Sequence, residues 1–156
     1  MTSKPALEFL KDFKSYWAEI PQPGIYYTLY FTKVISAAPG NVIFEFKVPM
    51  DATDESGEFL STGNLICVVD LCCITNCDSL KLDWVLKNLQ QVGVTVSLNL
   101  SFTGRQARIG DTLVIHTKLL DVADRVIVSR FIVYDRVTGD LHAHGTQTAA
   151  LLAPKL

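Results

Sequence analysis

Apolar residues recur at helical spacing near the start of the chain and again before its middle. Between Pro5 and Trp17 they lie on one face with charged residues between them, which predicts an amphipathic helix. The segment Ser61–Leu80 carries apolar or small residues on nearly every side, so it predicts a helix that other elements cover. Asp70 lies inside this covered helix, where an unpaired carboxylate is costly or stays protonated. Asp70 is therefore a candidate functional residue, with a structural ion pair or a subunit contact as the alternative.

Patterns typical of β-strands cover much of the remaining sequence. The predicted strands are Tyr26–Ser36, Val42–Val48, Val94–Phe102, Thr112–Asp121, Arg125–Arg136 and Leu141–Leu151. Residues that favour turns separate several of them, at Ala38–Asn41, Asp121–Asp124 and Val137–Asp140. We interpret Asp51–Glu58 as a loop and Asp83–Gln91 as a short helix or a loop.

The order of these elements predicts the fold class. Consecutive strands joined by short turns pair in an antiparallel sheet. The long apolar helix needs that sheet around it, so we expect an α+β fold with a central helix. Residues 1–24 are expected to form an N-terminal helix and a linker, and residues 25–156 a single domain.

Composition narrows the classes of partner. The 156 residues carry a net charge of -2, and their 14 Lys and Arg residues are scattered, which argues against binding of nucleic acid. No apolar run reaches the roughly 18 residues that a membrane span requires. We expect a cytoplasmic protein, and a mitochondrial location stays open.

Cysteine and histidine offer little sign of a metal site. Cys67, Cys72, Cys73 and Cys77 lie in the one covered helix, without the spacing typical of metal ligands, so we expect small buried apolar side chains. His142 and His144 alternate with apolar neighbours, so we expect them to share a solvent-facing side of a strand, with a metal pair as the alternative. His116 is also expected at the solvent.

Three blocks of sequence resemble one known family. They are TKVISAAPGNVIFE (Thr32–Glu45), GEFLSTGNLICVVD (Gly57–Asp70) and VTVSLNLSFTGRQARIGD (Val94–Asp111). In this order they resemble the hot-dog fold acyl-CoA thioesterases, in the branch typified by phenylacetate-pathway thioesterases and thioesterase superfamily member 2. The resemblance implies an antiparallel sheet wrapped around the central helix.

The resemblance also implies roles for individual residues. Asp70 falls on the family's catalytic acid, as general base or nucleophile, and Thr95 on a hydroxyl that holds the attacking water. The backbone amides of Thr62 and Gly63, at a helix N-terminus, would polarise the thioester carbonyl. The sequence departs from the family at Ser61-Thr62-Gly63, where His-Gly-Gly is usual, and at Glu55, where an asparagine is frequent.

Further residues are assigned to substrate binding. Glu55, or its neighbour Glu58, could replace the family's asparagine, with an ordinary solvated acid as the alternative. Ser61 and Asn64 lie where a substrate would approach. For Ser61, a role as the N-cap of the helix, accepting from the backbone amide of Asn64, is at least as good an interpretation as a role in the site. Arg105 and Arg108 could meet the phosphates of coenzyme A, with a solvated turn as the alternative.

These implications together predict an acyl-CoA thioesterase of lipid metabolism. It would need no cofactor besides the coenzyme A of its substrate, and no metal. The family resemblance implies a homodimer joined along Val94–Phe102, with a tetramer as a further expectation. It also places the site of Asp70 at the dimer interface, with partner groups from the other subunit. Two alternatives remain open: a non-catalytic protein that binds acyl-CoA or another lipid-like ligand, and an interaction protein.

Overall fold

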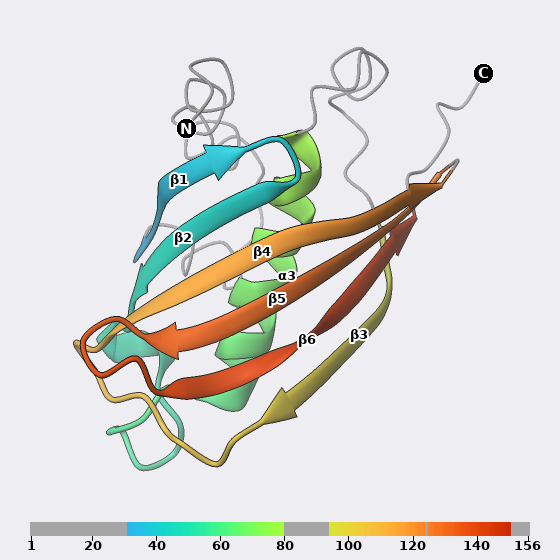
Figure 1. Cartoon of the computed structure of the whole chain (residues 1–156). Coiled ribbons are helices and arrows are strands. Elements are labelled where there is room, and N and C mark those ends of the chain that lie inside the picture. Colours follow the sequence, from blue (N-terminus) through green and yellow to red (C-terminus); the bar gives the residue numbers. More distant parts are fainter. Residues whose placement is uncertain (1–30, 80–93, 124, 151–156) are drawn as a thin grey trace.

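One helix lies against a six-stranded antiparallel sheet (Figure 1). The computed structural model describes residues 31–79, 94–123 and 125–150. The sheet order is β1-β2-β4-β5-β6-β3, so β1 and β3 form its two edges. The elements are β1 (Thr32–Ala38), β2 (Asn41–Lys47), the short 3-10 helix η2 (Met50–Ala52), α3 (Thr62–Asp78), β3 (Val94–Phe102), β4 (Thr112–Ala123), β5 (Val126–Asp135) and β6 (Leu141–Ala150).

This architecture confirms the predicted α+β class and the central helix. The predicted helix Ser61–Leu80 is α3, and Val94–Phe102 is β3 with the same bounds. The first strand ends at Ala38 rather than Ser36, because the reversal is confined to Pro39 and Gly40, whose φ of 70° suits glycine. The predicted elements Pro5–Trp17 and Asp83–Gln91 lie outside the described residues, as does the beginning of the strand predicted from Tyr26.

The core lies between α3 and the concave face of the sheet. Alternate residues of β2, β4 and β5 point toward the helix and are fully buried, among them Phe44, Ile115 and Phe131. The helix contributes Leu65, Val68, Val69, Cys72 and Cys73 to the same cluster. A helix that the sheet covers this widely needs no broad polar face, which explains its uniformly apolar sequence.

Hydrogen bonds fix both ends of α3. The Ser61 hydroxyl caps the N-terminus by accepting from the backbone N–H of Asn64 at 3.1 Å. At the other end, the backbone N–H of Gly40 donates to the Ser79 hydroxyl at 2.7 Å. The second bond ties the end of the helix to the β1–β2 turn, whereas the first is internal to the cap and defines where the helix begins.

The prediction that His142 faces solvent together with His144 is wrong. His142 is buried, with 7% of its surface exposed, whereas His144 is exposed. The cause is a bulge in the β5–β6 pairing, where Tyr134 faces Leu141 and Val133 faces Ala143, so that His142 is an extra residue in β6. Its Nδ1 then lies 3.3 Å from the carbonyl oxygen of Arg105.

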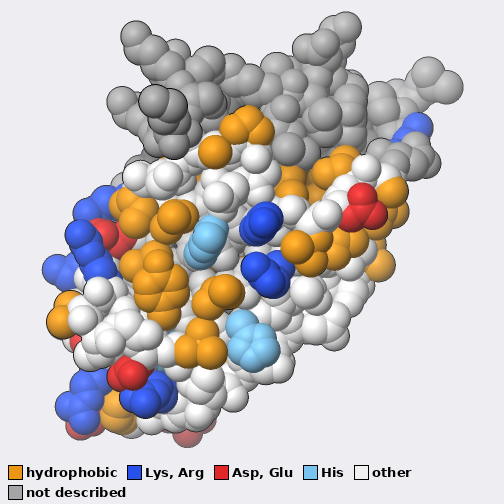
Figure 2. Space-filling model, viewed as in Figure 1, with side chains coloured by type: hydrophobic (Ala, Val, Ile, Leu, Met, Phe, Trp, Pro, Cys, Tyr) orange, Lys and Arg blue, Asp and Glu red, His pale blue; other side chains and the backbone are white. Residues whose placement is uncertain are grey.

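The convex face of the sheet mixes apolar and basic side chains. Figure 2 shows Lys, Arg and His side chains near the middle of this face, among apolar ones. Within the described residues, no helix combines the length and the apolar character that crossing a membrane requires.

Candidate active site

The Asp70 carboxylate is held by side chains from two neighbouring strands. Thr95, near the start of β3, donates its hydroxyl to Asp70 Oδ1 at 2.8 Å. Gln147, in β6, donates Nε2 to the same oxygen at 2.5 Å. The strands β6 and β3 are the last two of the sheet (Figure 1). The hydrogen bonds therefore bring the three side chains together near the β3 edge.

The second carboxylate oxygen is left available. Within the part of the chain that the structure describes, Asp70 Oδ2 accepts no hydrogen bond and forms no ion pair. The residue is partly exposed rather than sealed in the core. The structural alternative of a buried ion pair thus finds no partner among the described residues, and the geometry is that of an acid anchored by one oxygen.

Gln147 was missed by the sequence analysis. It is 1% exposed and lies in the inward register of β6 together with Ala143 and Ala149, which are also buried. The sequence does show an amide in line with small apolar residues of the same predicted strand, which is unusual for a core position. That these positions face inward depends on the register of the strand, which no motif specifies.

The N-terminal turn of α3 presents free backbone donors. Among the described residues, none accepts from the backbone N–H of Thr62 or Gly63, and both residues are exposed. Ser61 is occupied, since its hydroxyl also accepts from Asn64 Nδ2 at 2.8 Å. Gly63 and Asp70 are seven residues apart, so they share a face of the helix at a separation of about 10 Å along its axis.

Solved structures with this architecture identify the fold. Thioesterase superfamily member 2 from zebrafish superposes with a TM-score of 0.76 at 25% identity, over 97% of this chain and 99% of that one. The mouse protein of the same name gives 0.73 at 23% identity, over 98% and 100% of the two chains. A hypothetical thioesterase protein from Streptococcus pneumoniae, solved with coenzyme A, gives 0.67 at 17% identity, over 80% and 88%.

The chain has the hot-dog fold of the thioesterase superfamily. The predicted resemblance is thereby confirmed. No protein-family model matches the chain, and no curated protein matches it in sequence.

The acids expected to replace the asparagine of hot-dog thioesterases lie in the loop before α3. Glu55 and Glu58 are both exposed, and neither contacts Asp70. The loop itself is ordered by its own contacts, since Asp54 Oδ1 accepts from the backbone N–H of Ser56 at 3.0 Å. A role for Glu55 in orienting water or substrate stays a prediction.

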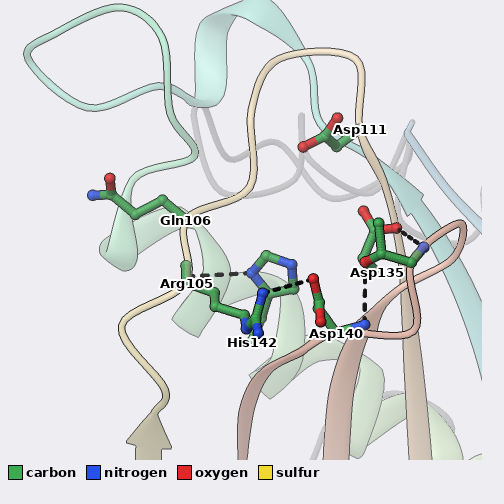
Figure 3. Close-up of a pocket in the computed structure, with 7 residues that line it drawn as sticks. Arg105, Gln106, Asp111, Asp135, Asp140 and His142 are labelled. Carbon is green, nitrogen blue, oxygen red and sulfur yellow. Dashed lines mark hydrogen bonds and ion pairs between the residues drawn. The ribbon is translucent and has the colours of Figure 1, made fainter.

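The two arginines expected at the rim of the hot-dog site differ in their surroundings. Arg105 Nη1 forms an ion pair with Asp140 Oδ2 at 2.7 Å, in a pocket of about 270 Å³ that Asp111 and Asp135 also line (Figure 3). Three aspartates against one arginine make this pocket a poor site for phosphate. The guanidinium of Arg108 lies 5.3 Å from the centre of the Phe59 ring and, unlike Arg105, forms no ion pair with a described acid.

The cysteines of α3 are not reactive groups. Cys72, Cys73 and Cys77 are buried as predicted, whereas Cys67 is partly exposed. Burial raises the pKa of the Cys73 thiol, and burial followed by the charge of Asp70 raises the pKa of Cys67. A thiolate nucleophile is therefore disfavoured beside Asp70. The described residues contain no group of three or more His, Cys, Asp or Glu side chains arranged to hold a metal ion.

Proposed function

We propose that this protein is an acyl-CoA thioesterase in which Asp70 activates the attacking water. The observation that carries the proposal is the Asp70 carboxylate, which Thr95 and Gln147 hold through Oδ1 while Oδ2 has no partner among the described residues. Support for the substrate class comes from the streptococcal protein of the same fold, which was solved with coenzyme A.

The hydrolytic step follows from this geometry. Asp70 Oδ2 takes a proton from a water molecule, and the water oxygen bonds to the carbonyl carbon of the thioester. The negative charge that develops on the carbonyl oxygen is stabilised by the backbone N–H groups of Thr62 and Gly63. The carbon–sulfur bond then breaks, the free acid forms, and the thiolate of coenzyme A takes the proton from Asp70.

The spacing along α3 suits this assignment. Asp70 and Gly63 lie on one helix face, about 10 Å apart along the axis, and the free amide of Thr62 is next to that of Gly63. Side chains on a helix lean toward its N-terminus, which shortens the gap that a water molecule and a thioester carbonyl must bridge. Since these donors are backbone groups, the replacement of the family's His-Gly-Gly by Ser61-Thr62-Gly63 leaves them in place.

A second form of the step uses Asp70 as the nucleophile. Its carboxylate would then attack the thioester directly and give a mixed anhydride, which water hydrolyses in turn. Label found in Asp70 after a single turnover in ¹⁸O-labelled water identifies the nucleophilic form. Direct attack followed by water attack at the aspartyl carbon places the label in Asp70, whereas general-base catalysis leaves Asp70 unlabelled.

The Asp70→Asn variant tests the proposal. We expect turnover to fall at least ~100-fold, the scale of a lost acid–base group, while the circular dichroism spectrum is retained. The assay follows the absorbance of the thioester with substrates from acetyl-CoA to long-chain acyl-CoA and phenylacetyl-CoA. Asp140→Asn is the matched control, because that acid pairs with Arg105 away from Asp70, and its rate is expected to be unchanged. An Asp70→Asn enzyme as fast as the wild type contradicts the mechanism.

Binding without turnover is the second candidate function. Its support is that the Ser61 hydroxyl is engaged as the helix cap, so it does not replace the histidine usual in the family. A binding protein would hydrolyse none of the thioesters, and its Asp70→Asn variant would retain the affinity of the wild type. Calorimetric titration with a non-hydrolysable acyl-CoA thioether distinguishes this outcome from the absence of binding that an interaction protein would show.

A further inference from the structure

Gln147 is a buried amide for which the fold alone provides no clear use. It faces α3 from β6, in register with Leu98 of β3 and Ser129 of β5, and is 1% exposed. Within the described residues its Oε1 is buried without a hydrogen-bond partner. A polar atom in that state costs stability, so packing alone does not explain an amide at this position.

The nitrogen of the same amide is fully engaged with Asp70 and its neighbour. Gln147 Nε2 lies 2.5 Å from Asp70 Oδ1, 3.1 Å from the backbone carbonyl oxygen of Asp70 and 3.2 Å from the Thr95 hydroxyl oxygen. An ionised carboxylate only accepts hydrogen bonds, so the nitrogen and not the oxygen of the amide must face it. Among the described residues, the Gln147 side chain therefore forms hydrogen bonds only with Asp70 and Thr95.

We propose that Gln147 is the positioning residue that fixes the direction of the Asp70 carboxylate. This inference rests on the proposed thioesterase function and assigns Gln147 a role within it. Thr95 alone could hold Oδ1 while the carboxylate turns about that bond. A second donor on the same oxygen, from a different strand, stops this rotation and leaves Oδ2 pointing in one direction.

The hydrogen bond to the Asp70 backbone holds the Gln147 amide in place, so that it can fix the direction of the Asp70 carboxylate. Because Nε2 also reaches the carbonyl oxygen of Asp70, the amide is tied to the main chain of the residue whose side chain it orients. Rates of positioned reactions depend steeply on alignment, and a displacement of about 1 Å costs on the order of 10²-fold. The unpaired Oε1 is then the stability cost of this alignment.

Two substitutions at Gln147 separate the shape of the side chain from its hydrogen bonding. Gln147→Met retains the length and removes both polar atoms. Gln147→Glu retains the shape but replaces the N–H donor with an oxygen that faces Asp70 Oδ1. Ser129→Ala is the matched control, because Ser129 lies directly opposite in the β5–β6 pair and its buried hydroxyl likewise has no partner among the described residues.

The expected results distinguish a positioning role from a structural one. We expect kcat of Gln147→Met to fall about 10- to 100-fold while KM stays within about threefold, because the substrate contacts remain and the base is misaligned. Its urea unfolding midpoint should fall only modestly, since removal of the unpaired Oε1 offsets part of the loss of the Nε2 hydrogen bonds to Asp70 and Thr95. Gln147→Glu should lose at least as much kcat, and Ser129→Ala should stay within about twofold.

Crystal structures of the wild type and of Gln147→Met complete the test independently of turnover. The Asp70 carboxylate should keep its direction in the wild type and rotate about the Thr95 hydrogen bond in the variant. An unchanged kcat in Gln147→Met, an equal loss in Ser129→Ala, or an unmoved carboxylate in the variant each overturns the proposal. If the wild type hydrolyses no acyl-CoA, the proposed function fails, and the two crystal structures still decide whether Gln147 orients Asp70.

Discussion

At the scale of single residues, His116 shows how neighbouring side chains on the convex face of the sheet change the pKa of a histidine. Its Nε2 lies 2.6 Å from Asn41 Oδ1, and the two residues lie on adjacent strands. Partial burial lowers the pKa of His116 below its usual value of 6.5, and the charges of Arg130 and then Lys118 lower it further. These two cations face each other in the β4–β5 register, and neither forms an ion pair among the described residues.

Arg130→Gln is expected to raise the pKa of His116. The folded protein disfavours the protonated ring, so the unfolded chain binds this proton more readily. The contribution of His116 to stability is therefore complete well above pH 6.5 and decreases as the pH falls through that value. Removal of the Arg130 charge should reduce this loss. NMR titration of the His116 ring measures the shift directly, and Arg125→Gln, at the far end of the β4–β5 pair, is the control. Equal pKa values in wild type and Arg130→Gln contradict the assignment of this charge effect.

Residue by residue, the candidate site was predictable where a helix face or a family motif marks it. Asp70 follows from a carboxylate in an apolar helix, and Thr95 from the resemblance, and the structure brings the two within 2.8 Å. Gln147 was not predictable, because its approach to Asp70 depends on the register of β6 against β3. For Arg105 the structure favours the solvated alternative, since its partner Asp140 comes from a distant turn that no local pattern connects to it.

At the scale of elements, the close approach of β3, β5 and β6 depends on one glycine. Gly145 lies between Leu100 of β3 and Phe131 of β5 in the sheet register. A Cβ atom at this position would lie 1.9 Å from the carbonyl oxygen of Asn99 and 2.8 Å from the Phe131 ring. The first of these neighbours is backbone, so β6 would have to move away from β3.

Gly145→Ala is expected to lower the free energy of unfolding by at least about 2 kcal/mol, the scale of an overpacked core. Urea denaturation monitored by circular dichroism measures the loss. Gly63→Ala is the control, because no atom lies within 4 Å of the added Cβ and alanine is the better helix former. A Gly145→Ala protein as stable as the wild type would show that the strands tolerate a wider separation. Since Gln147 lies two residues further along β6, the variant should also lose activity.

The elements themselves were predicted to within one or two residues at most of the ends that the structure describes. Alternation defines β2 and β5, and the Val137–Asp140 turn is recovered with Gly139 at a φ of 75°. The bulge that buries His142 was not predictable from β6 alone. Alternation assumes unbroken pairing, and the extra residue is set by how β5 and the chain around Arg105 meet β6.

At the scale of the whole molecule, β3 is one of the two edge strands of the sheet and the one that carries a residue of the candidate site. β3 pairs with β6 on one side, and no described strand pairs with its other side. Three of its apolar residues are exposed: Val94 at 48%, Val96 at 67% and Phe102 at 45%. A long edge strand with exposed apolar residues invites pairing with another chain. We therefore expect two copies to join along β3 into one continuous sheet, with the Asp70 site next to the junction because Thr95 lies on this strand.

Val96→Lys tests the junction and its link to the site. A lysine on an edge strand opposes strand pairing, so we expect the dissociation constant of the dimer to rise at least ~10-fold, or about 1.4 kcal/mol. Turnover should fall in parallel if the partner chain completes the site.

Val137→Lys is the matched control, because Val137 is 89% exposed in the β5–β6 turn and the charge change is the same. Sedimentation equilibrium across a dilution series, with activity assayed at each concentration, measures both effects. A wild type that is monomeric and fully active throughout the series contradicts the shared site, whereas activity that follows the dimer fraction in both variants supports it.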